Sequence, residues 1–110
     1  MNYDSPYVIL GTETVADLQI AMSRHPAGLF LDMTTLKAIL RAYMNGQLSD
    51  DSLLQLAEFL EMNEGVSVPS IESRAINDIL FSVANPEINF PNTIEKMQSL
   101  LGMSPYSDSL

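Results

Sequence analysis

Residues 36–64 read LKAILRAYMNGQLSDDSLLQLAEFLEMNE, and this stretch decides the fold because it predicts two amphipathic helices joined by a tight turn. In its first half, apolar side chains recur at the i, i+3, i+4, i+7 spacing of one helix face, at Leu36, Ile39, Leu40, Tyr43 and Met44. Asn45-Gly46 is a turn signal, and Gly46 fits a left-handed helix C-cap. Ser49 is placed to cap the next helix. So short a link predicts that the two helices are antiparallel neighbours.

The helix predicted from Ser49 to about Asn63 has two distinct sides. With about 100° per residue, one side carries four apolar residues, Leu53, Leu56, Ala57 and Leu60. The opposite side carries Asp51, Gln55, Glu58 and Met62, and Leu54, Glu58 and Glu61 are successive neighbours at i+4 and i+3. Phe59 falls on a shoulder that the core face covers incompletely. We therefore expect a buried leucine face and an outward face of acids beside Leu54 and Met62.

Outside this stretch, the pattern predicts three more helices. The first follows Gly11, is capped by Thr12 or Thr14, and stops at His25-Pro26. The next spans 71–85, with Ser70 as its cap and Pro86 as its end. The last covers 93–102, with a capping box of Asn92 and Glu95. Further core positions are expected on these helices, at Val15, Leu18, Met22, Ala75, Ile76, Ile79, Leu80, Val83, Ile94, Met97, Leu100 and Leu101.

The chain is therefore predicted to be one all-α domain over residues 1–110, a compact bundle of about five helices with room for one or two short extra helical turns. Residues 1–11 are expected to be irregular, with YVIL at 7–10 as a candidate extended segment. Residues 103–110 are expected to form a frayed tail.

The composition limits the partners. Five Lys and Arg stand against fourteen Asp and Glu, giving a formal charge of −9. Phosphate and anionic lipid surfaces are bound by clusters of Lys and Arg, so we expect neither nucleic acid nor membrane as a direct partner. Cysteine is absent, which excludes disulfides and thiolate metal sites. The N-terminus has no basic region before its short apolar run, and no stretch approaches the ~20 apolar residues of a membrane span. The expected location is the cytoplasm.

Catalytic chemistry has little support in the sequence. His25 is the only histidine, and its place at a helix end favours a capping role. Zinc is disfavoured with one His and no Cys, and no nucleotide-binding loop, nucleophile elbow or calcium loop is present. We expect no enzyme activity, no cofactor and no metal. A small enzyme that depends on His25 stays as an open alternative.

A long gap in positive charge is the strongest functional signal. No Lys or Arg lies between Arg41 and Arg74. The same interval contains six acidic residues, namely Asp50, Asp51, Glu58, Glu61, Glu64 and Glu72. A one-signed surface repels itself, so it indicates either a solvated acidic face or a docking surface for a basic partner. For docking, the candidate partner-binding residues are Asp51, Glu58, Glu61, Glu64 and Glu72 for charge, with Leu54, Phe59 and Met62 for apolar contact.

Two segments also resemble a known group of proteins. Residues 36–66 and INDILFSVANPEIN at 76–89 are similar to small acidic all-helical immunity proteins of bacterial toxin systems, including those of contact-dependent growth inhibition. The similar positions are Tyr43, Gly46, Leu48 and Ser49; Leu56, Ala57, Leu60 and Glu61; and Leu80, Phe81, Ala84, Asn85, Pro86, Glu87, Ile88 and Asn89. Leu56 departs from the group, in which many members carry Trp.

The resemblance implies stoichiometric inhibition by protein–protein contact. The expected partner is a cognate toxin domain, basic and most often a nuclease, bound 1:1 by a monomer in the cytoplasm. The resemblance transfers no contact residues. Within it, the ANPEIN segment is interpreted structurally, with Asn85-Pro86 ending one helix and Asn89 to Asn92 preparing the cap of the next. An acidic helical adaptor or secretion chaperone is the alternative function, and because such proteins usually act as dimers, the mass in solution separates the two.

Overall fold

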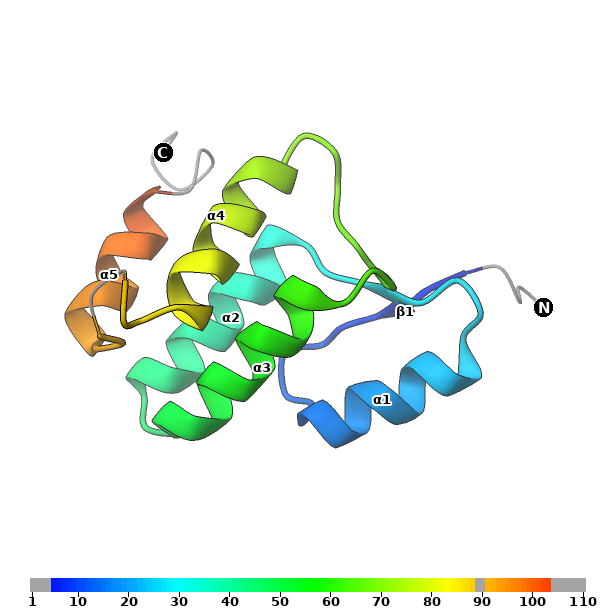
Figure 1. Cartoon of the computed structure of the whole chain (residues 1–110), viewed down its shortest axis with the longest axis horizontal. Helices are drawn as coiled ribbons and strands as arrows, with labels where there is room; N and C mark the ends of the chain where they lie inside the picture. The colour runs from blue at the N-terminus through cyan, green and yellow to red at the C-terminus, as the bar shows by residue number, and fades with distance from the viewer. Residues whose placement is uncertain (1–4, 89–90, 104–110) are drawn as a thin grey trace.

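The computed structural model describes residues 5–88 and 91–103, and in these residues it forms a small all-α bundle with a minor sheet. The elements are β1 (Tyr7–Val8), α1 (Val15–Arg24), β2 (Leu29–Phe30), α2 (Met33–Met44), α3 (Asp50–Met62), β3 (Val66–Ser67), α4 (Ser73–Ala84) and α5 (Ile94–Met103). α2, α3 and α4 form the centre, α5 lies beside α2, and α1 lies with the strands toward the other end (Figure 1). The prediction of about five helices is confirmed.

The α2–α3 hairpin forms as its sequence predicts. The Asp32 side chain accepts a hydrogen bond from the Thr35 N–H and caps α2. Gly46 ends the helix with φ of +79°, the left-handed conformation expected of it. The Ser49 hydroxyl then accepts from the Ser52 N–H and starts α3. The caps predicted at Gly46 and Ser49 are thus confirmed.

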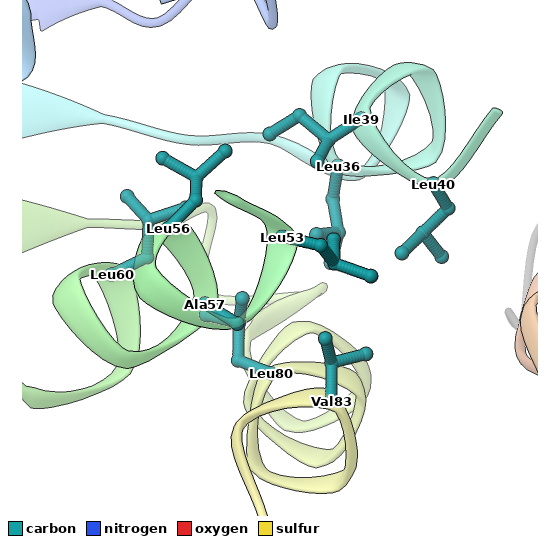
Figure 2. Close-up of a pocket in the computed structure, with 9 residues that line it drawn as sticks. All are labelled: Leu36, Ile39, Leu40, Leu53, Leu56, Ala57, Leu60, Leu80 and Val83. Atoms are coloured by element: carbon teal, nitrogen blue, oxygen red, sulfur yellow. The ribbon is translucent and has the colours of Figure 1, made fainter. Parts of the chain in front are cut away.

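The core lies where α2, α3 and α4 meet. All four residues predicted for the inner face of α3 are buried, and α4 buries Ile76, Ile79, Leu80, Val83 and Ala84. Nine side chains from the three helices surround a cavity of only about 10 Å³, namely Leu36, Ile39, Leu40, Leu53, Leu56, Ala57, Leu60, Leu80 and Val83 (Figure 2). Because these side chains are all apolar, a water molecule there would find no hydrogen-bond partner. The cavity is therefore a packing gap and offers no ligand site.

A three-stranded parallel sheet was not predicted beyond the extended start of YVIL. Its order is β1-β2-β3, with Tyr7 opposite Leu29 and Leu29 opposite Val66. Strands of two residues carry too short an alternation to be recognised in a sequence. The sheet requires a close backbone approach, since the Gly65 carbonyl accepts from the Leu29 N–H at 2.8 Å directly beside Gly28.

The ends of α4 and α5 differ from the prediction. Ser70 does not cap a helix from 71, because residues 70–72 form turns and α4 starts at Ser73 with Glu72 before it. The predicted capping box of Asn92 with Glu95 is also wrong. Thr93 caps α5 instead, with its hydroxyl accepting from the Lys96 N–H at 3.1 Å.

Some positions predicted for the core lie nearer the surface. Ile94, the first residue of α5, is 49% exposed. Val15, Met22, Met44, Ala75 and Leu101 are half-buried and pack against the edge of the core. Leu18, Met97 and Leu100 are buried as expected. The frayed tail predicted over residues 103–110 is wrong at Met103, which is the last residue of α5. Residues 104–110, with residues 1–4 of the irregular N-terminus, lie outside the described residues.

Tyr43 joins three parts of the bundle. Its hydroxyl oxygen lies within hydrogen-bond distance of Asp50 Oδ1, at the start of α3, and of the Asn92 carbonyl oxygen before α5. The hydrogen bond to the Asp50 carboxylate, together with burial and the carboxylate charge, raises the pKa of Tyr43 to about 12. The phenol therefore keeps its proton in the folded protein where a free tyrosine would lose it.

This raised pKa predicts a loss of stability in alkali. An unfolded tyrosine ionises near pH 10, so the contribution of Tyr43 is complete below that pH and disappears between about pH 10 and 12. We expect Tyr43→Phe to cost about 1 kcal/mol at neutral pH. Urea unfolding of both proteins from pH 8 to 11 should show the difference in free energy shrinking above pH 10. A difference that stays constant over this range would contradict the assignment.

Candidate protein-binding face

The outward side of α3 presents acidic and apolar side chains together. We define the acidic face as Asp51, Leu54, Glu58, Glu61 and Met62. Asp51 and Glu58 are exposed, Leu54 and Glu61 are half-buried, and Met62 is 79% exposed. The helical wheel therefore placed this side of α3 correctly.

The carboxylates of the acidic face are little used within the described fold. Asp51 lies in the first turn of α3, where its charge suits the positive end of the helix dipole, whereas Glu58 and Glu61 lie further along the helix. Among the described residues, no hydrogen bond or ion pair involves the side-chain carboxylates of Asp51, Glu58 or Glu61. Surface acids that stabilise a fold usually cap a helix or pair with a cation. These three side chains are thus free to meet charges on another molecule.

The two half-buried apolar candidates differ in their packing. Phe59 packs against the core, whereas Leu54 is not among the side chains that do. Apolar groups that are unpaired in the monomer gain most from burial at an interface. Leu54 and Met62 are therefore the better candidates for contact with a partner, whereas Phe59 packs within the protein's own fold.

Glu64 and Glu72 lie outside α3, and so outside the acidic face as defined. Glu64 is exposed in the turn after α3. Glu72 is half-buried, and its Oε1 accepts a hydrogen bond from the Met33 N–H at 2.9 Å. Met33 is the first residue of α2, and the positive end of the helix dipole there also stabilises the Glu72 carboxylate. Glu72 thus holds two segments of the fold together, a role that its position in the sequence did not reveal.

The segment at 84–89 has the structural role expected of it over the described residues. The Asn85 N–H and side-chain amide both donate to the Phe81 carbonyl, which closes the end of α4. Asn92 donates from its side chain to the Val83 carbonyl at 3.0 Å, so it links the following loop back to α4. Asn89 lies outside the described residues. These hydrogen bonds orient α5, whereas the N-terminus of α5 is capped by Thr93.

A groove that the sequence did not indicate lies beside the acidic face. Two adjoining cavities of about 270 and 280 Å³ form it, and both are lined by Thr12, Glu13, Gln47, Leu48 and Leu56. Ser52 and Gln55 of α3 line the first cavity as well. Gln55 lies one helical turn from both Asp51 and Glu58, so the groove and the acidic face are continuous. Its lining comes from three separate segments, which is why no local pattern marks it.

Other kinds of site find less support in the described part of the chain. Over residues 5–88 and 91–103, no helix is long and apolar enough to cross a membrane, and no three acidic or histidine side chains are grouped to hold a metal ion. His25 follows α1 as its C-cap and lies beside Tyr7, with ring centroids 5.5 Å apart.

Comparisons of the chain with protein-family models, with curated proteins and with solved structures found no match. The chemistry of the acidic face and of the groove therefore carries the functional interpretation.

Proposed function

We propose that the protein is an immunity protein that binds a cognate basic toxin domain and neutralises it by forming a 1:1 complex. The observation that carries the proposal is the set of three carboxylates on α3 that have no side-chain partner among residues 5–88 and 91–103, beside Leu54 and Met62. The resemblance of residues 36–66 and 76–89 to immunity proteins of contact-dependent growth inhibition supports it. The proposed location is the cytoplasm, and we propose no enzyme activity.

The acidic face gives this inhibition a physical mechanism. A nuclease must accept phosphate groups, so the surface around its active site is basic. Carboxylates at Asp51, Glu58 and Glu61 would take the place of those phosphates. Opposite charge accelerates association, while buried apolar contacts such as Leu54 slow dissociation. We therefore expect the association rate to fall steeply as salt is added.

Charge reversal on α3 tests the proposal directly. Glu58→Lys combined with Glu61→Lys should weaken binding to the toxin domain encoded by the adjacent upstream reading frame by about 100-fold or more, since close interfacial charge pairs contribute ~1.5–7 kcal/mol. Binding is measured by calorimetry and surface plasmon resonance, and the helical fold is checked by circular dichroism.

The chain offers a matched control for this experiment. Glu87→Lys combined with Glu95→Lys changes the net charge by the same amount at exposed positions after α4 and in α5. We expect this variant to bind nearly as tightly as the wild type. Equal weakening by both pairs would show that only net charge matters, and unchanged binding of the Glu58 and Glu61 variant would overturn the acidic-face proposal.

A further inference from the structure

The groove beside α3 has the size of a site for one long side chain. Each of its cavities, about 270 and 280 Å³, falls just below the ~300 Å³ at which small-molecule pockets begin. The walls are the residues before and at the start of α1, the turn between α2 and α3, and the first turns of α3. Three elements of the bundle thus hold the groove in shape.

The lining combines an apolar floor with polar walls. Val15, Leu48 and Leu56 supply aliphatic surface. Hydroxyl and amide groups come from side chains of all three elements, namely Thr12, Thr14, Gln47, Ser52 and Gln55. Among the described residues of the lining, Glu13 is the only charged one. A ligand suited to this lining has an aliphatic stem and one positive charge.

Glu13 is held in its charged form. Burial alone would raise the pKa of this half-buried carboxyl, but hydrogen bonds from the Leu10 N–H, the Tyr7 hydroxyl and the Gly11 N–H lower it below its ordinary value. These bonds also fix the carboxylate between β1 and α1. Glu13, a lining residue of the groove, therefore carries a fixed negative charge at neutral pH.

The same hydrogen bonds favour an ammonium over a guanidinium group. Arginine gains most from a carboxylate when it makes two parallel hydrogen bonds to both oxygens. In Glu13, Oε2 already accepts two hydrogen bonds and Oε1 accepts one. A lysine ammonium is a compact charge whose three donors can reach acceptors in different directions, such as hydroxyl and amide oxygens on opposite walls.

We propose that this groove receives a lysine side chain of the protein partner, with its stem on Leu48 and Leu56 and its ammonium beside Glu13. The inference rests on the proposed function, because Gln55 makes the groove continuous with the acidic face that would meet the same partner. The groove adds what a charged face lacks, since it accepts one side chain of a defined length and charge. Charge on the face would set the association rate, and the seated lysine would fix the register of the complex.

A titration of the isotopically labelled full chain by NMR tests the groove without the toxin. The probe is acetyl-Gly-Lys-Gly-amide in about 0.15 M salt, where long-range attraction is screened. For this one seated side chain we expect a dissociation constant of about 1 mM. We expect amide shifts at Glu13, Gln47, Ser52 and Gln55. The norleucine peptide, which keeps the stem and lacks the charge, should cause none, and the arginine peptide should bind several-fold more weakly.

Two variants with the same net charge test whether the lysine peptide binds in the groove. Gln47→Lys places a competing ammonium at the groove and should abolish the shifts, whereas Gln98→Lys, at an exposed position on α5, should leave them unchanged. Gln47→Lys should also weaken toxin binding at least tenfold relative to Gln98→Lys. The groove proposal is overturned by equal shifts with norleucine, by shifts confined to the acidic face, or by no shift at about 10 mM peptide.

The outcomes separate the two proposals. If the lysine peptide does not bind in the groove while charge reversal at Glu58 and Glu61 still weakens the complex, the groove proposal is wrong and the acidic-face proposal is supported. If lysine peptide binds in the groove but the reversal leaves toxin binding unchanged, the acidic-face proposal fails.

Discussion

Gly28→Ala is expected to destabilise the protein by about 3 kcal/mol or more. Gly28 has φ of +85°, where a residue with a Cβ atom costs about 1–2 kcal/mol. A Cβ atom there would also lie 2.1 Å from the Gly65 carbonyl oxygen. That oxygen belongs to rigid backbone and accepts the hydrogen bond from Leu29 that joins β2 to β3. Relief of the clash therefore requires the strands to separate.

Gly46→Ala provides the control for this substitution. Gly46 has a similar φ of +79°, but an added Cβ atom would meet nothing within 4 Å. We expect a loss of about 1 kcal/mol from the backbone conformation alone. Urea unfolding of the three proteins, followed by circular dichroism, measures both losses. Equal losses would show that the approach of Gly28 to Gly65 does not limit stability.

Leu53→Ala is expected to cost about 3 kcal/mol, within the ~2–5 kcal/mol of buried leucine truncations. Leu53 is 1% exposed and contributes to the lining of the cavity between α2, α3 and α4 (Figure 2). Truncation enlarges that gap, and its apolar walls leave water no partner with which to fill it. Because three helices meet there, the structure can collapse only partly around the lost atoms.

Leu54→Ala is the matched control one residue further along the same helix. Leu54 is half-buried and does not pack against the core, so the loss of stability should stay below about 1 kcal/mol. Its loss of affinity for the toxin domain should exceed that of Glu87→Lys. The two leucines thus separate folding from binding, and similar losses of stability at both positions would contradict this division.

The parts of the fold that the sequence predicted are those with local causes. The caps at Ser49 and Gly46 and the leucine face of α3 depend on residues within a few positions of one another. Glu72 lies just before a helix that was predicted to include it, and its carboxylate accepts a hydrogen bond from the N–H of Met33, 39 residues away in the chain. The strands also depend on pairing between distant segments. No periodicity encodes such contacts.

The candidate site, too, could be predicted from the sequence only where its residues lie on one helix. The helical wheel was sufficient for the outward position of Glu58, Glu61 and Met62, since one helix presents them all. The wheel could not separate Leu54, which is free of the core, from Phe59, which packs on it. The groove could not be predicted from the sequence, because Glu13, Gln47 and Gln55 come together only when three elements pack.

The small sheet has a consequence for the order of folding. α2, α3 and α4 follow one another in the chain with only residues 45–49 and 63–72 between them, so these helices can assemble through contacts near in sequence, with a small entropy of loop closure. The Ser67 hydroxyl, by contrast, donates to the Leu29 carbonyl 38 residues away, and Thr35 reaches the Ile9 carbonyl across 26 residues. Closure of the sheet is therefore expected to follow helix assembly. A newly made chain would then display the acidic side of α3 before the segment carrying Glu13 completes the groove.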